Sequence, residues 1–170
     1  MKKIYILLFL TFSLSGFKSP NAFEPNYKFH SVYIYNFTKY IQWPAQGGDF
    51  KIYILGQQPE AADAFRLMAE SKTAGTRQIT VKSFANLNEL NEADIVFIPR
   101  SFSSFTPETA KKFTGKNTLL ITEKEGMIEK GSSINFVIID DKLKFEISKA
   151  NLEKAGLKVS TQLMQMAIVK

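Results

Sequence analysis

Asp94-Ile-Val-Phe-Ile98 is the segment of the sequence that decides the fold. Its apolar residues follow one another without the polar–apolar alternation of a half-exposed strand. A short continuous apolar run is typical of a strand with both faces buried, as in the middle of a parallel sheet. The run therefore predicts a layered α/β domain with this strand near the centre of its sheet.

Strands and helices alternate on both sides of this segment. The predicted strands cover residues 50–55, 77–82, 94–98 and 118–122, and the predicted helices cover 28–42, 59–70 and 106–115, with a short helical turn over 86–91. Residues 134–139 and 142–147 predict a β-hairpin joined at Asp140-Asp141, and residues 148–170 are predicted to be helical with a break at Gly156. We expect one α/β domain, a single layered unit with a mostly parallel or mixed sheet flanked by helices, with a C-terminal β-hairpin and helix.

The first predicted helix has two distinct faces. Its apolar stripe comprises Phe29, Val32, Tyr33, Phe37, Tyr40 and Ile41. Helical spacing places Lys28, Tyr35, Lys39 and Gln42 along one line on the opposite side. Tyrosine beside lysine is typical of protein interfaces, although a solvated helix face gives the same pattern. Asn36 lies on the apolar stripe, and we interpret its amide as a structural group that holds the turn at Trp43-Pro44.

The N-terminus has the layout of a secretory signal peptide. Two lysines precede a mostly apolar run that ends at Leu14, too short to cross a membrane as a helix. We assign residues 1–22 to the signal peptide, with the cleavage position left open, and residues 23–170 to the domain. Loss of Lys2, Lys3 and Lys18 lowers the formal net charge from +6 to +3, so half of the basic character belongs to the leader. We therefore expect a periplasmic protein without a nucleic-acid partner.

Residues with catalytic or metal-binding chemistry are scarce. The chain has no cysteine, which excludes disulfides, a thiol nucleophile and cysteine-ligated metals. The single histidine, His30, lies on the apolar side of the first helix, where a packed ring is more common than a catalytic base. Asp140-Asp141 is better explained as a turn than as a metal site, because aspartate tolerates left-handed backbone geometry. We predict a protein that is not an enzyme and that carries neither cofactor nor metal.

Three loops follow the carboxyl ends of predicted parallel strands, where open α/β sheets bind ligands. They are residues 56–58, 100–104 and 123–125. The second loop leads into a helix start at Thr106-Pro-Glu108, where we expect a capping hydroxyl and free backbone amides that favour an anion. The candidate ligand-binding residues are Arg100, Ser101, Ser103 and Ser104. An ordinary polar connection is the alternative interpretation.

Two blocks of the sequence resemble the YfiR-like family. The first is Val-Tyr-Ile-Tyr-Asn-Phe-Thr-Lys-Tyr-Ile-Gln-Trp-Pro (Val32–Pro44), with Ile-Leu-Gly (Ile54–Gly56) in the next strand. The second comprises Gly-Ser-Ser-Ile-Asn-Phe (Gly131–Phe136), Lys-Phe-Glu-Ile (Lys144–Ile147) and Ala-Gly-Leu-Lys-Val-Ser-Thr-Gln-Leu (Ala155–Leu163). The likeness extends in order and spacing over nearly all of the chain after the leader.

This resemblance implies a small periplasmic α/β protein, commonly a homodimer. The best-known role in the family is repression of an inner-membrane diguanylate cyclase through its periplasmic sensing region; release of the cyclase raises cyclic di-GMP. Some members carry cysteines linked to redox control, and this chain has none, so thiol sensing does not transfer. Ser148 stands where asparagine is usual, and Gly131-Ser132 stands in place of a pair of glycines.

The leading hypothesis is a non-enzymatic periplasmic regulator that binds a membrane-bound signalling protein, either a diguanylate cyclase or a sensor kinase. Its predicted contact residues are Tyr35, Lys39, Leu163 and Met164. The alternative is an exported protein that binds a small ligand at the loops near Arg100. An exported hydrolase is disfavoured, because the sequence offers no nucleophile–base pair.

Overall fold

The computed structural model describes residues 25–44 and 47–170, so the predicted signal peptide at residues 1–22 lies outside the described residues. In chain order the strands are β1 (Ile41–Gln42), β2 (Phe50–Leu55), β3 (Thr73–Ala74), β4 (Arg77–Phe84), β5 (Ile95–Ile98), β6 (Leu119–Thr122), β7 (Ile134–Ile139), β8 (Lys142–Ile147), β9 (Lys158–Val159) and β10 (Ile168–Val169). The helices are α1 (Tyr27–Tyr40), α2 (Pro59–Ala69), α3 (Thr106–Lys112), α4 (Lys149–Ala155) and α5 (Thr161–Met166), with 3₁₀ turns η1 (Leu87–Glu89) and η2 (Arg100–Phe105).

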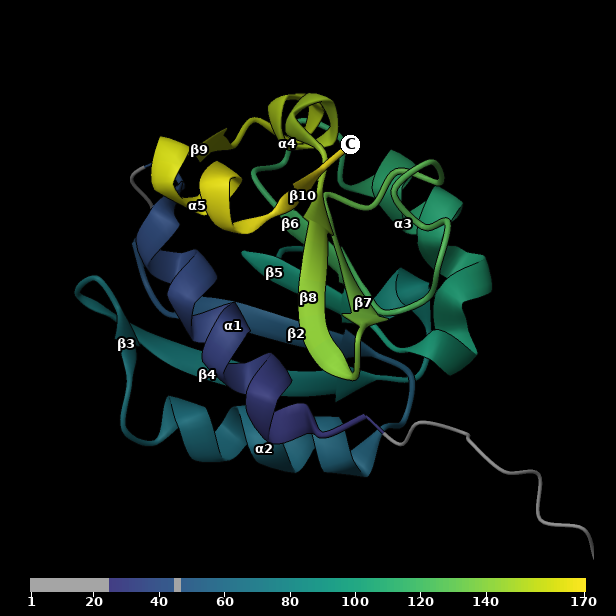
Figure 1. The fold of residues 1–170 in the computed structure, drawn as a ribbon. Helices are drawn as coiled ribbons and strands as arrows, with labels where there is room; N and C mark the ends of the chain where they lie inside the picture. The colour runs from purple at the N-terminus through teal and green to yellow at the C-terminus, as the bar shows by residue number, and fades with distance from the viewer. Residues whose placement is uncertain (1–24, 45–46) are drawn as a thin grey trace, which may run out of the picture.

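A mixed sheet forms the centre of the molecule (Figure 1). Its strand order is β10-β8-β7-β6-β5-β2-β4-β3. The neighbours from β4 to β7 are parallel, whereas β8 is antiparallel to β7 and β3 is antiparallel to β4. All residues of β5 are buried, as its apolar run predicts. The predicted fold class is thus confirmed, including the hairpin of β7 and β8.

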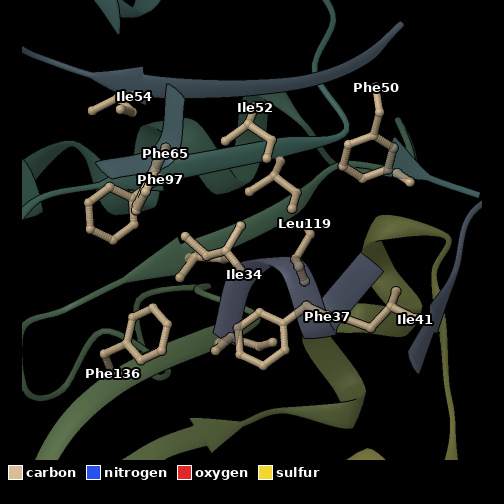
Figure 2. Packing of buried hydrophobic residues seen from close by; sticks show 14 of the residues in the cluster. Ile34, Phe37, Ile41, Phe50, Ile52, Ile54, Phe65, Phe97, Leu119 and Phe136 are labelled. Carbon is tan, nitrogen blue, oxygen red and sulfur yellow. The ribbon is translucent and has the colours of Figure 1, made fainter. Parts of the chain in front are cut away.

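Hydrophobic side chains pack against both faces of the sheet. The larger cluster joins α1, α2, α4 and α5 to the sheet, and the smaller one lies under η1 and the end of α3. Figure 2 shows Ile34, Phe37 and Ile41 among sheet side chains such as Ile52 and Leu119. Because α1 and α2 also contact each other, the two helices form one layer on this face.

The buried face of α1 differs from the predicted stripe. Tyr27, His30, Ile34, Phe37 and Ile41 face the sheet, at alternating spacings of three and four residues. The predicted core positions Phe29 and Val32 are instead 60% and 58% exposed. The predicted stripe left out Ile34, which is fully buried, although His30 was correctly placed on the buried side.

The end of α1 is also held differently from our expectation. The helix ends at Tyr40, two residues earlier than predicted, and β1 follows at once. Asn36 Oδ1 lies 3.5 Å from Lys39 Nζ and accepts its hydrogen bond. The Trp43 indole N–H donates to the Asp94 carbonyl oxygen at 3.2 Å. The turn at Trp43 is therefore fixed by the start of β5, and the structural role predicted for Asn36 is wrong.

The C-terminal segment is a mixture of short elements and not the interrupted helix that we predicted. α4 ends at Gly156, whose φ of 83° is the left-handed geometry that favours glycine. β9 then pairs antiparallel with β1, and β10 adds to the sheet parallel to β8. Each of these strands has only two residues. Such strands depend on partners distant in sequence, so local pattern cannot reveal them.

The predicted hairpin turn and the two serines that depart from the family pattern are each accommodated locally. Asp140 and Asp141 have φ values of 52° and 57°, which confirms their interpretation as the hairpin turn. Ser148 caps α4 by accepting a hydrogen bond from the Asn151 backbone N–H at 3.3 Å. The buried Ser132 hydroxyl donates to the Ile134 carbonyl oxygen at 2.7 Å. Both serine side chains therefore have hydrogen-bond partners where they lie.

Candidate functional site

The loop after β5 carries the predicted ligand-binding residues. Arg100, Ser101 and Ser104 are exposed, but Ser103 is buried. These residues form η2, and the Arg100 backbone N–H donates to Glu123 Oε1 at 2.9 Å. The backbone amide at the start of this turn therefore already donates its hydrogen bond to a carboxylate of the chain itself. The structure does bring the predicted loops together: the Arg100 loop contacts Glu123, and its Phe102 ring lies against Gly56.

Thr106 does not have the capping role that we predicted. η2 runs directly into α3, and the Thr106 backbone N–H donates to the Ser103 carbonyl oxygen. Its hydroxyl is buried and has no hydrogen-bond partner among the described residues. The start of α3 thus does not present the free amide that the anion-binding hypothesis requires at this position. An ordinary polar connection describes this loop better.

Glu123 lies in a buried polar cluster that joins α1 to the carboxyl end of β6. Its side chain is 5% exposed, and its Oε1 accepts hydrogen bonds from the Tyr27 hydroxyl and the Arg100 backbone N–H, both at 2.9 Å. Its Oε2 has no hydrogen-bond partner among the described residues and lies 3.5 Å from His30 Nε2. Burial raises the pKa of Glu123, and burial followed by the nearby Glu123 charge raises the pKa of Tyr27.

His30 is a packed residue, as the sequence predicts. Its Nδ1 lies 3.2 Å from the Asn26 carbonyl oxygen, which can only accept, so Nδ1 carries a proton. Burial lowers the pKa of His30 to about 4, so the ring is neutral near pH 7. Its Nε2 then presents a lone pair to Glu123, and the two groups do not form an ion pair at that pH. The ring packs edge-on against Phe136 at a centroid distance of 4.5 Å.

The space beside this cluster is small. The cavity lined by His30, Arg100, Glu123 and Phe136 has a volume of about 30 Å³. A volume of this size is close to that of one water molecule. The cluster can thus hold a proton and fix the N-terminus of α1 to the sheet, but it leaves no room for a substrate. Within the described residues, no group of three or more His, Asp or Glu side chains is placed to hold a metal ion.

The outward face of α1 carries a second candidate site. Phe29, Val32, Tyr35 and Lys39 follow one another at spacings of three and four residues, which places them on one side of the helix. Lys39 Nζ lies 4.1 Å from the centroid of the Tyr35 ring, in cation–π contact. The predicted line of Tyr35 and Lys39 is therefore extended by two large apolar side chains.

The predicted contacts near the C-terminus are only partly on the surface. Leu163 is 1% exposed and belongs to the hydrophobic core, so its prediction as an accessible contact residue is wrong. Met164 is half-buried against the same core. α5 lies beside the end of α1, where Gln162 Nε2 donates to the Tyr40 hydroxyl at 3.5 Å. Met166, which we did not predict, is the most exposed large apolar residue of α5.

A groove between α1 and α2 adjoins the outward face of α1. It has a volume of about 880 Å³, and its apolar lining includes Val32, Ala64, Leu67 and Met68. The sequence pattern did not predict this groove, because it assigned Val32 to the core and led to no prediction that Leu67 is exposed. Leu67, which is 62% exposed, lies outside the buried positions of α2. The placement of Leu67 midway between the buried residues Phe65 and Ala69 is the sequence signal that could have predicted an exposed apolar side chain on α2.

Comparison with models of protein families gives one match. The family described as YfiR/HmsC-like matches residues 27–168, which run from the first residue of α1 to β10. A search of curated proteins found no match. No helix among the described residues is long and apolar enough to span a membrane. The match covers all the elements described above except the last residue of β10, and it agrees with the sequence resemblance at both ends of the chain: the protein belongs to the YfiR/HmsC-like family, a family of regulators.

Proposed function

We propose that this protein is a non-enzymatic periplasmic regulator in cyclic di-GMP signalling. In this proposal it binds the periplasmic region of an inner-membrane sensor protein, with a diguanylate cyclase as the first candidate and a sensor kinase as the second. Membership of the YfiR/HmsC-like family supports the regulatory role. The leader-like sequence of residues 1–22 supports export.

One observation supports the outward face of α1 as the surface that binds the partner. The outward face of α1 leaves two large apolar side chains, Phe29 and Val32, exposed beside Tyr35 and Lys39. Single exposed apolar residues are common on protein surfaces. A row of them along one helix face that ends in an aromatic–cation pair is typical of a protein contact. A standard interface of about 800 Å² per partner would cover this face and reach α5, including Met164.

The test is capture of the purified partner domain by the purified protein. The double variant Tyr35→Ala and Lys39→Glu should weaken binding by at least about tenfold, because it removes an aromatic anchor and reverses a charge. The matched control is Tyr53→Ala with Lys82→Glu, since both residues lie on the sheet away from α1. Equal binding by the wild type and by the α1 double variant would show that this surface is wrong.

Two other parts of the proposal have their own measurements. Cell fractionation should recover the mature chain with periplasmic markers, and mass spectrometry should show a cleaved N-terminus. Light scattering of the purified protein tests the homodimer that the family resemblance implies. A membrane cyclase encoded beside this chain would favour the first candidate partner.

A further inference from the structure

The groove between α1 and α2 has an apolar centre, and its lining includes two lysines, Lys28 and Lys72. Val32 of α1 and Leu67 and Met68 of α2 line the centre. Tyr35 and Lys72 line one end, where Lys72 Nζ lies 5.6 Å from the centroid of the Tyr35 ring. Lys39 Nζ lies 4.1 Å from the same ring. Two ammonium groups therefore approach one aromatic ring where the apolar lining ends.

Neither Lys39 nor Lys72 forms an ion pair with a carboxylate in the part of the chain that the structure describes. Of the two acids that line the groove, Asp63 pairs with Arg66 at 3.2 Å, and Glu60 accepts a hydrogen bond from Gln58. The positive charge beside Tyr35 is thus not neutralised by the groove itself. A single anionic group placed there would gain from both ammonium groups.

The dimensions of the groove favour a small molecule over a protein. A volume of about 880 Å³ lies within the range of small-molecule sites, which are concave and mostly apolar with a few polar groups at fixed places. The distance along α1 from Tyr27 to Tyr35 is about 12 Å, at 1.5 Å per residue. A flexible apolar chain fits such a length, with its charged end at Tyr35.

We propose that this groove binds a free amphiphile with an apolar chain and one anionic head group, a medium-chain carboxylate being the simplest case. The chain lies over Val32, Leu67 and Met68, and the head group lies beside Tyr35 at Lys72, with Lys39 adding positive charge next to the same ring. Burial of the chain provides the favourable free energy, and the two lysines select the sign of the head group. This inference goes beyond the proposed function and is tested without the partner protein.

The first experiment is calorimetric titration of the purified protein with sodium dodecanoate, below its micelle concentration. Dodecyltrimethylammonium has the same chain with a cationic head, and acetate has the anionic group without the chain. Dodecanoate should bind at least about fivefold more tightly than dodecyltrimethylammonium, and acetate should not bind measurably. Equal affinity for the two amphiphiles, or no heat with dodecanoate at either 15 °C or 37 °C, would overturn the proposal, since the large heat-capacity change of apolar burial makes the heat differ between temperatures.

Variants then locate the site. Leu67→Glu should weaken dodecanoate binding at least about fivefold, and Lys72→Glu should abolish the preference for dodecanoate over dodecyltrimethylammonium. Both residues are exposed, so circular dichroism of the variants should match the wild type. Ile139→Glu and Lys130→Glu are the matched controls, because both residues are exposed away from the groove, and they should leave the affinity within about twofold. An unchanged affinity in Leu67→Glu would place any binding elsewhere.

A final experiment distinguishes binding of a free amphiphile from binding of a lipid in a membrane. The protein is mixed with vesicles of phosphatidylglycerol, or of phosphatidylcholine as the neutral control, and sedimented. We expect the protein to stay in solution with both. Sedimentation with phosphatidylglycerol that Leu67→Glu abolishes would overturn the assignment of a free ligand and favour a lipid surface.

Discussion

Glu123 is an acid whose two oxygens have different surroundings. Oε1 accepts two hydrogen bonds, while Oε2 has no hydrogen-bond partner among the described residues and faces the lone pair of His30. An ionised carboxylate in such a place is costly, because burial removes its water and only one of its oxygens is compensated. The raised pKa of Glu123 expresses that cost.

Glu123→Gln should therefore increase the free energy of unfolding at pH 7 by about 1 kcal/mol. The amide oxygen can still accept from Tyr27 and Arg100, and the amide N–H can donate to His30 Nε2. Because a raised carboxyl pKa lowers stability as the pH rises from the unfolded value to the folded value, the gain should disappear in acid. Urea unfolding of the wild type and the variant at pH 4.5 and pH 7 measures this gain in the free energy of unfolding. Glu125→Gln, at an exposed position, is the control, and a loss of stability in Glu123→Gln at pH 7 would contradict the assignment.

His30 should have the opposite dependence on pH. Its folded pKa of about 4 lies below its ordinary value of 6.5, so between these values the unfolded chain binds more protons than the folded chain. The free energy of unfolding should thus fall as the pH drops from about 6.5 to 4, by at most about 1.4 kcal/mol per pH unit. Glu123→Gln is the right background, since only His30 of the pair then titrates. His30→Phe in that background should remove the slope; a slope that persists would come from other groups.

At the scale of the element, the orientation of α1 is the main correction to the sequence pattern. Ile34 is fully buried, whereas Phe29 is mostly exposed. Ile34→Ala should lower the free energy of unfolding by about 2–5 kcal/mol, because it leaves a cavity against the sheet. Phe29→Ala should change it by no more than about 0.5 kcal/mol. Chemical denaturation of the two variants shows which face of α1 is buried. A loss of free energy of unfolding in Phe29→Ala as large as that in Ile34→Ala would support burial of Phe29, as in the predicted stripe.

Gly56 ends β2 in a conformation that other residues rarely adopt. Its φ is 89°, and a Cβ atom at this position would overlap the Phe102 ring. Gly56→Ala should therefore destabilise the protein by about 2–4 kcal/mol, combining backbone strain with overpacking. Gly115 has a φ of 70° with no atom near the position of a Cβ, so Gly115→Ala isolates the backbone cost. The two thermal unfolding curves should differ by several degrees, and equal shifts would show that Phe102 moves aside without cost.

At the scale of the whole molecule, the last residues close one edge of the sheet. The Lys170 backbone N–H donates to the Ile147 carbonyl oxygen at 3.0 Å, and its Nζ lies 3.0 Å from Glu146 Oε1. Removal of residues 167–170 should lower the free energy of unfolding by about 1–2 kcal/mol and expose the edge of β8 to association. Denaturation and light scattering measure the two effects. Lys170→Met keeps the strand and should lower the free energy of unfolding much less than the truncation does; an equal loss would show that the effect comes from the ion pair with Glu146.

The sequence predicts the layers of this molecule better than its surfaces. Continuous apolar runs such as β5 and the turn at Asp140-Asp141 are local signals, and each is where it was expected. The two-residue strands β9 and β10 depend on pairing across the whole chain, and no local pattern marks them. The prediction of Leu163 as an accessible contact residue is wrong for a related reason. Leu163 is an apolar residue that could lie either in a contact surface or in the core. Only the position of α5 against α1 shows that it is buried.

The pairing of β1 with β9 joins Ile41 to Val159, so one closing contact spans most of the chain. During synthesis, α1 is made early, but its end has no β-partner until residue 159 has left the ribosome. Contacts between such distant residues give a high contact order, which slows folding because a long loop must close first. The pairing of β1 with β9 is thus among the last contacts that the growing chain can form.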